Sequence, residues 1–138
     1  MPSRIFLAED AALQAKIYQR TLNRISDVEV TVYEDGLEVY LEMFRNPPNL
    51  LILDVNLPTL SGAAALRLLK YDRVTGPIPI LMLSAHSDNG EMEFRLRDMR
   101  ANGYLAKPFK PEQLTAEVNR LLGRPLDLLS DATQDSQA

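Results

Sequence analysis

The sequence contains no cysteine and only one histidine, His86. Without thiols, the chain cannot form a disulfide, a thiolate metal site or a cysteine nucleophile. A single imidazole also excludes zinc sites built from several histidines, and it argues against a histidine-based catalytic triad. Basic residues are also few: the chain has 15 basic and 19 acidic residues, which gives a net charge of −4. This balance argues against direct contact with nucleic acid and favours a cationic ligand such as a metal ion.

Long hydrophobic runs are also missing. No apolar stretch approaches the roughly 20 residues that a membrane-spanning helix needs. The N-terminal segment MPSRIFLAED lacks the apolar centre of a signal peptide. We therefore expect a cytoplasmic protein without membrane contact. The 138 residues are otherwise an ordinary globular mixture, 46% hydrophobic and 25% charged, which suffices for one domain with a sizeable core.

Short apolar runs recur along the chain and predict five β-strands. They are Arg4–Ala8, Val28–Tyr33, Leu50–Val55, Ile78–Ser84 and a weaker run at Gly103–Lys107. The first, third and fourth do not alternate polar and apolar residues, which is typical of strands buried on both faces. Segments with helical spacing lie between the runs. This strict alternation predicts an α/β fold, with a parallel sheet covered by helices on both faces.

Apolar residues at helical spacing mark the faces that we expect the helices to turn toward the sheet. They are Leu13, Ile17, Thr21 and Ile25; Leu37, Leu41 and Phe44 with Tyr40 beside them; Leu66 and Leu69; Met92, Leu96 and Met99; and Leu114, Val118, Leu121 and Leu122. Capping-box spacing at Asp88–Glu91 precedes the fourth helix. Pro111 and Gly123 bracket the fifth. We assign residues 1–123 to one domain and residues 124–138 to a flexible polar tail or linker.

Polar side chains stand where four of these strands end. Glu9 and Asp10 follow the first strand, Asp54 ends the third, Ser84 the fourth and Lys107 the fifth. Ligands of open parallel sheets bind beyond the carboxyl ends of the strands, so we expect these groups to share one edge. Three crowded carboxylates need a compensating cation, and Mg²⁺ with oxygen ligands is the natural one. Asp54 is the best placed nucleophile, because carboxylates form acyl phosphates, and Lys107 with Ser84 would complete a phosphate clamp.

Each of these residues has an ordinary explanation when it is taken alone. An acidic pair often decorates the start of a helix, and a lone lysine is usually solvated. Asn56 and Pro58 fit plain turn chemistry and helix entry. Their joint occurrence at successive strand ends is what indicates a functional site.

In this order and spacing, the residues resemble the receiver domain of bacterial two-component response regulators. The resemblance runs from Arg4 to about Gly123. It rests on Glu9–Asp10, on Asp54 followed by Asn56, Pro58 and Gly62, on Ser84 followed by Ala85, and on YLAKPF at Tyr104–Phe109. It implies a doubly wound (βα)5, flavodoxin-like three-layer sandwich with strand order 2-1-3-4-5. It also implies a phosphorylation-dependent signalling switch, not an enzyme, whose only reactions are its own phosphotransfer and autodephosphorylation.

The resemblance further implies how the phosphorylation site is built. Asp54 would accept a phosphoryl group from a sensor histidine kinase. Asp10 and Asp54 would hold Mg²⁺, with Mn²⁺ as a substitute. Glu9 would help through a water molecule, and Asn56 would supply its backbone carbonyl. Lys107 would pair with the phosphoryl oxygens, and its bond to Pro108 is expected to be cis.

The same resemblance implies a conformational switch and residues that set the lifetime of the phosphoryl group. Ser84 would hydrogen-bond a phosphoryl oxygen, and Tyr104 would turn inward as Ser84 moves. The surface of the fourth helix, fifth strand and fifth helix would then change. The side chains of Asn56 and His86 would flank the path of the attacking water and tune the phosphoryl lifetime.

Three positions depart from the family pattern. Arg100 stands where a glycine often ends the fourth helix, so we expect the turn beside the fifth strand to differ locally. Ser61 replaces a common acidic or amide residue, and His86 is an unusual residue two positions after Ser84. None of these changes touches the phosphorylation residues.

Two other functions remain open on the sequence alone. A phosphatase of the haloacid dehalogenase type also combines an aspartate nucleophile, a lysine and Mg²⁺. It needs a second acid two residues after the nucleophile, where this chain has Asn56. The other alternative is a receiver-like module that binds proteins without phosphorylation. For the switch, the expected partners are a histidine kinase or phosphotransfer protein, a downstream output protein or domain and, as an option on phosphorylation, a second copy of the chain.

Overall fold

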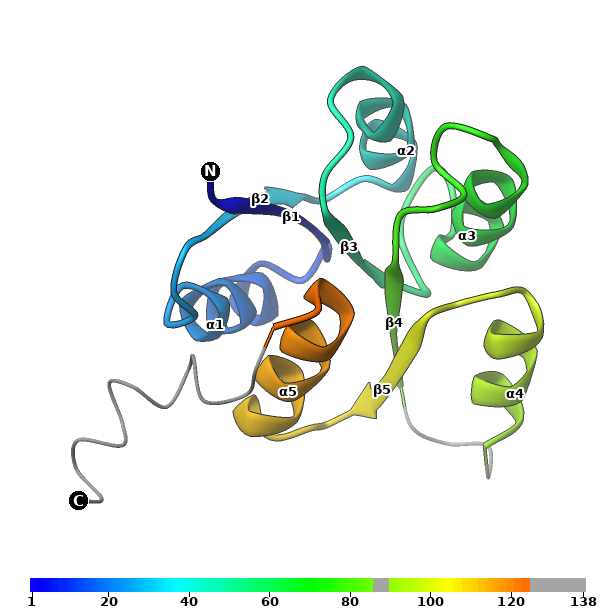
Figure 1. The fold of residues 1–138 in the computed structure, drawn as a ribbon. Coiled ribbons are helices and arrows are strands. Elements are labelled where there is room, and N and C mark those ends of the chain that lie inside the picture. Colours follow the sequence, from blue (N-terminus) through cyan, green and yellow to red (C-terminus); the bar gives the residue numbers. More distant parts are fainter. Residues whose placement is uncertain (86–89, 125–138) are drawn as a thin grey trace, which may run out of the picture.

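Strands and helices alternate along the chain in the computed structural model, which describes residues 1–85 and 90–124 (Figure 1). The strands are β1 (Ser3–Ala8), β2 (Val28–Tyr33), β3 (Leu50–Asp54), β4 (Ile80–Ala85) and β5 (Gly103–Lys107). The helices are α1 (Ala12–Leu22), α2 (Gly36–Arg45), α3 (Gly62–Tyr71), α4 (Glu91–Asp98) and α5 (Pro111–Leu122). All neighbouring strands are parallel, in the order β2-β1-β3-β4-β5. The predicted fold and strand order are confirmed.

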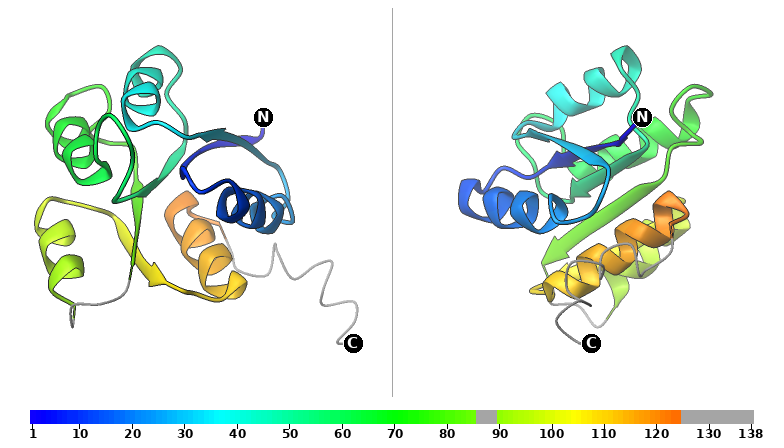
Figure 2. Two further views of the ribbon diagram at one scale, coloured as in Figure 1. Left: turned by 180° about the vertical axis from the view of Figure 1, so that it is seen from behind. Right: turned by 60° about the vertical axis from the view of Figure 1, so that its left-hand side comes forward.

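The sheet is the middle of three layers. Helices α1 and α5 cover one face, and α2, α3 and α4 cover the other (Figures 1 and 2). Side chains of the fully buried strand β3 alternate between two cores. Leu51 and Leu53 pack on the side of α2, α3 and α4, whereas Leu50 and Ile52 pack on the side of α1 and α5. Burial on both faces explains why β3 reads as a continuous apolar run.

The predicted contact faces of α1 and α2 are confirmed only in part: Ile25, Tyr40 and Phe44 pack on the core, whereas the other apolar residues predicted there are exposed. On α1, Leu13 and Ile17 are 72% and 49% exposed, and the buried residues are Ala15 and Leu22. On α2, Leu37 and Leu41 are exposed, whereas Val39 and Met43 lie in the core. Both helices carry apolar residues on more than one face, so local spacing alone does not identify the face that meets the sheet.

The predicted core residues of the other three helices are confirmed. The core holds Leu66 and Leu69 of α3, Leu96 of α4, and Leu114 and Val118 of α5. Met92 and Met99, on either side of Leu96, are partly buried against the same cluster.

The ends of the elements follow local chemistry. Pro111 begins α5, and Gly123 ends it at a φ of 73°, as predicted. Strand β4 begins at Ile80, two residues later than expected, because Pro79 has no N–H to donate to the sheet. Ser61 caps α3, since its Oγ accepts a hydrogen bond from the Ala64 N–H at 3.1 Å. The capping box expected from Asp88 falls outside the described residues.

Arg100 has a φ of 75°, in the left-handed region that glycine occupies without strain. It follows Met99, the C-terminal cap of α4, and leads through Asn102 into β5. The turn therefore has a residue with a side chain where glycine would avoid backbone strain.

Among the helices of residues 1–85 and 90–124, none has the length and apolar character that a membrane crossing requires.

Candidate functional site

Four strand ends bring the predicted polar residues to the carboxyl edge of the sheet. Glu9 directly follows β1, and Asp54 is the last residue of β3. Ser84 pairs in register with Ala106 of β5, and Ala85 pairs with Lys107. Parallel pairing keeps all these ends at the same edge, so residues up to 98 positions apart in sequence become neighbours.

Lys107 is the centre of this cluster. Its Nζ donates to Oε1 of Glu9 at 2.9 Å and to Oε1 of Gln14 at 3.2 Å, and it forms a close ion pair with Oδ2 of Asp54. The ammonium group has three protons. The three protons therefore match three oxygen acceptors: those of Glu9 and Asp54 at two strand ends and that of Gln14 on α1.

Both carboxylates of the cluster are buried. Glu9 is 1% exposed and Asp54 is 5% exposed. Burial raises the pKa of Glu9 above its usual value, and the neighbouring Asp54 raises it further, against the opposing effects of Lys107 and of the Ala11 N–H. Burial by itself would lower the pKa of Lys107, but the hydrogen bonds to Asp54 and Glu9 outweigh it and raise that pKa. Lys107 therefore compensates two carboxylates that would otherwise repel each other.

The backbone around Asp54 holds its side chain in one orientation. Oδ1 of Asp54 accepts a hydrogen bond from the Asn56 N–H at 2.8 Å, which leaves Oδ2 to face Lys107. Gly62 closes the loop behind it, because its N–H donates to the Val55 carbonyl at 2.7 Å. Within this loop Thr59 has a φ of 72°, which is rare for a β-branched residue. Such strain persists only where the surrounding structure imposes it, often next to functional groups.

The expected cluster of three carboxylates is not formed in the described residues. Asp10 is exposed, unlike Glu9 and Asp54. Across residues 1–85 and 90–124, no group of three or more acidic or histidine side chains is arranged to hold a metal ion. The donor types nevertheless suit Mg²⁺, since Glu9, Asp54, the adjacent Asp10 and the carbonyl of Asn56 all offer hard oxygen atoms.

In the described part of the chain, neither of the predicted switch residues Ser84 and Tyr104 forms a hydrogen bond with Glu9, Asp54 or Lys107. Ser84 is buried, and its Oγ donates to the backbone carbonyl of Ala85 at 3.3 Å. Tyr104 is partly buried against the core on the α4 side of the sheet. His86, the other residue predicted to tune the phosphoryl lifetime, lies outside the described residues.

A segment after β5 completes the site. The peptide bond between Lys107 and Pro108 is cis. The ring of Phe109 stacks on that of Tyr18 from α1, with centroids 5.2 Å apart and an interplanar angle of 24°. Burial raises the pKa of Tyr18; the charge of Lys107 opposes this rise, and the charges of Glu9 and Asp54 add to it. Tyr18 therefore belongs to the same electrostatic neighbourhood.

Sequence reasoning missed the two α1 residues of this neighbourhood, Gln14 and Tyr18. Their spacing of four residues, in the helix that follows Glu9–Asp10, was the available signal, because it puts both on one helix face. The missing information was which face of α1 turns toward β5.

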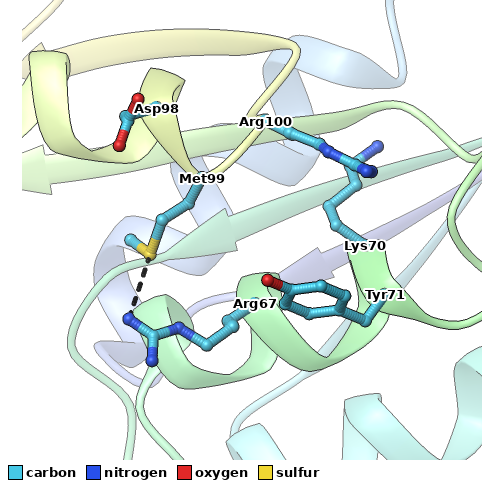
Figure 3. Close-up of a pocket in the computed structure, with 6 residues that line it drawn as sticks. All are labelled: Arg67, Lys70, Tyr71, Asp98, Met99 and Arg100. Carbon is cyan, nitrogen blue, oxygen red and sulfur yellow. Dashed lines mark hydrogen bonds between the residues drawn. The ribbon is translucent and has the colours of Figure 1, made fainter.

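A separate hollow of about 260 Å³ lies away from this site, between the C-terminal ends of α3 and α4 (Figure 3). It is lined by Arg67, Lys70, Tyr71, Asp98, Met99 and Arg100. The buried Lys70 donates to the carbonyls of Gly76 (3.1 Å) and Ile78 (2.8 Å) and to Oδ1 of Asn102 (2.7 Å). Burial lowers its pKa, and the charge of Arg100 lowers it further. Lys70 thus connects α3 through hydrogen bonds to the segments that precede β4 and β5.

Comparison with known proteins points to one family. Residues 5–119 match the family model of the response regulator receiver domain. The DNA-binding response regulator MtrA of Mycobacterium leprae is 32% identical over 98% of this chain and 60% of its own length. The chain thus spans about three fifths of the length of the MtrA proteins that it matches.

Two solved structures are similar to this chain. The receiver domain of a sensor histidine kinase from Pseudomonas aeruginosa, solved with magnesium in its active-site cleft, matches with a TM-score of 0.79 and 28% identity over 89% of this chain and 99% of that one. The phosphorylated cyanobacterial phytochrome response regulator RcpA matches with a TM-score of 0.71 and 30% identity over 89% of this chain and 91% of that one.

Proposed function

The chain belongs to the family of response regulator receiver domains, which act in two-component signalling, and we propose that Asp54 is its phospho-acceptor. The observation that carries this proposal is the pairing of buried Asp54 with Lys107 at the end of the central strand β3. One carboxylate oxygen is held by the Asn56 N–H, and the other faces a cation. The second oxygen is thus oriented for attack on phosphorus, beside a positive charge that compensates the growing negative charge.

A divalent metal ion belongs to this proposal. Asp10, Asp54 and the Asn56 carbonyl would hold Mg²⁺, with Glu9 acting through water, and Mn²⁺ would take the same oxygen ligands as a substitute. When bound, the ion supplies positive charge that lets two anions approach each other. The chain's own residues do the rest: Asp54 presents the attacking oxygen, and Lys107 pairs with the phosphoryl oxygens.

Phosphorylation would change the partners of the nearby switch residues. It puts a charge of roughly −1.5 to −2 on a side chain that carried −1. The Ser84 hydroxyl, which now donates to the Ala85 carbonyl, would turn to a phosphoryl oxygen. Tyr104 would then turn inward, and the α4–β5–α5 surface would change for a downstream partner or a second copy of the chain.

The lifetime of the phosphoryl group belongs to the proposal as well. The side chains of Asn56 and His86 would flank the in-line path of the attacking water, so autodephosphorylation would depend on both. A phosphatase of the haloacid dehalogenase type is not favoured, given the family match and the amide at position 56.

The partners and the setting are proposed at a coarser level. A histidine kinase or phosphotransfer protein would supply the phosphoryl group, and an output protein or domain would receive the signal. MtrA is named as a DNA-binding regulator, and the absence of direct nucleic-acid contact by this chain stays a prediction. A tail or linker at 124–138 and a cytoplasmic setting remain part of the proposal.

Phosphorylation by acetyl phosphate in the presence of Mg²⁺ tests the acceptor. Intact-protein mass spectrometry should find one added phosphoryl group that hydroxylamine removes. The Asp54→Asn variant should gain none. The control Asp98→Asn, at an exposed residue of α4, should be labelled like the wild type. Full labelling of Asp54→Asn would overturn the assignment.

A further inference from the structure

Gln14 lies against Lys107, the basic side chain of the proposed phosphorylation site. Its Oε1 accepts a hydrogen bond from Lys107 Nζ at 3.2 Å, next to the bonds that Lys107 makes to Glu9 and Asp54. Because an ammonium group has no acceptor, only the oxygen of the Gln14 amide can face it. Gln14 therefore takes the one ammonium proton that neither carboxylate uses.

The contact is part of a helix face that is fitted to the segment after β5. Gln14 lies in the first turn of α1, and helical side chains lean toward the N-terminus, here toward the end of β1. Tyr18, one turn later on the same face, stacks on Phe109, two residues after Lys107. Two contacts from one helix face thus reach one short segment: the Tyr18–Phe109 stack, and the hydrogen bond from Lys107 to the exposed Gln14 side chain.

Lys107 must change partners if Asp54 is phosphorylated. In the resting protein its protons point to two carboxylates and one neutral amide. The oxygen of Asp54 that it now contacts would become part of an acyl phosphate, and Lys107 would then face the phosphoryl oxygens. Gln14 is the only neutral one of the three acceptors recorded for Lys107 in the described part of the chain, so its bond can persist while the charges on the other side are exchanged.

We infer that Gln14 is a positioning residue, which holds Lys107 over the phosphoryl group during both phosphorylation and dephosphorylation of Asp54. This inference rests on the proposed function. In each direction phosphorus is transferred between an oxygen of Asp54 and another atom, and negative charge spreads over the same three phosphoryl oxygens. A residue that orients Lys107 toward those oxygens therefore lowers both barriers together.

The test is Gln14→Met, which keeps the length of the side chain and its helix propensity and removes the amide oxygen. We expect the rates of phosphorylation by acetyl phosphate and of dephosphorylation to fall by a similar factor, about three- to tenfold, which corresponds to the net contribution of one ordinary hydrogen bond. Phosphoramidate should report the same factor, because Gln14 acts on Lys107 and not on the donor. Gln19→Met, a change at another glutamine of α1, is the matched control and should leave both rates unchanged.

Two further measurements separate positioning from a general effect on α1. In a Lys107→Met background, Gln14→Met should have no additional effect on either rate, since the group through which it acts is gone. In the unphosphorylated protein, the Lys107 ammonium protons should exchange faster with water in Gln14→Met than in the wild type, as measured by NMR of ¹⁵N-lysine samples.

The outcomes also distinguish this inference from the proposed function. No labelling of the wild-type protein would count against Asp54 as an acceptor, and the ammonium exchange would still report on Gln14. Normal labelling of the wild type with equal rates in Gln14→Met would overturn the inference alone. So would a rate loss of the same size in the Lys107→Met background.

Discussion

A Cβ atom added to Gly62 would lie 1.9 Å from the backbone carbonyl oxygen of Asp54. The start of α3 therefore packs directly against the end of β3, at the residue that we propose as phospho-acceptor. The Gly62 N–H donates to the Val55 carbonyl at 2.7 Å, and this bond requires the same close approach. The glycine of the sequence motif is thus explained by contact, and not by an unusual φ at position 62.

Gly62→Ala should accordingly destabilise the domain and disturb the site. We expect the free energy of unfolding to fall by about 1–3 kcal/mol, the usual cost of overpacking, and phosphorylation of Asp54 to slow. Urea unfolding and acetyl phosphate labelling measure the two effects. Gly123→Ala is the control, because that position has a φ of 73° but open space around it. Normal labelling of Gly62→Ala would mean that β3 and α3 separate without moving Asp54.

Asn119→Leu should stabilise the protein. Asn119 of α5 is fully buried, and neither polar atom of its side chain has a hydrogen-bond partner in the described part of the chain. An apolar side chain of similar size removes the cost of burying these two polar atoms without hydrogen bonds. We therefore expect the free energy of unfolding to rise by about 1–2 kcal/mol. Thermal or urea unfolding measures it, and Asn119→Asp should show the opposite sign because it buries a charge. A loss in Asn119→Leu would reveal an ordered water as the missing partner.

Arg100→Gly should also be stabilising. Arg100 holds a φ of 75°, and a left-handed conformation costs a residue with a Cβ about 1–2 kcal/mol. The same change removes a positive charge that acts on the buried Lys70. Part of the gain is offset by the greater freedom of glycine in the unfolded chain, so we expect a net gain of up to about 1 kcal/mol. In Arg95→Gly, inside α4, the sign should reverse. Equal losses in both variants would contradict the assigned strain.

The stability of the protein should depend on pH through Lys70. Its pKa is lowered from the ordinary 10.5 by burial and by Arg100, so the folded state releases the proton at a lower pH than the unfolded state does. Between the lowered pKa and 10.5 the unfolded state binds more protons, and the free energy of unfolding therefore rises with pH. Below this window the full cost of burying the charge is present.

Lys70→Met isolates this effect from the other groups that titrate in the same range. The variant leaves the carbonyls of Gly76 and Ile78 and Oδ1 of Asn102 without their donor, so it should be less stable than the wild type at every pH. The gap between the two proteins should widen as the pH rises from the lowered pKa of Lys70 toward 10.5, as measured by urea unfolding. Parallel profiles would show that Lys70 titrates normally in the folded state.

The sequence by itself determined the order of the elements and which residues follow the strands. Continuous apolar runs revealed the buried strands, and Pro111 and Gly123 marked the ends of α5, because these signals depend only on nearby residues. The strand order came from resemblance to a family, since no local pattern states which strands become neighbours. The positions of Asp54 and Lys107 at the ends of two predicted parallel strands were enough to place them in one predicted site.

The tertiary structure alone decided which side chains meet. It turned Leu13 and Leu37 outward, directed Glu9 inward toward Lys107, left Asp10 exposed and brought Gln14 onto the same ammonium group. Glu9 and Asp10 lie between β1 and α1, so the path of the chain after β1 decides which of them turns inward. The positions of Leu13, Leu37 and Gln14 depend on how α1 and α2 rotate about their axes when they pack on the sheet. That rotation is set by the volumes of side chains far apart in the sequence, and a helix with apolar residues on two faces carries no local record of it.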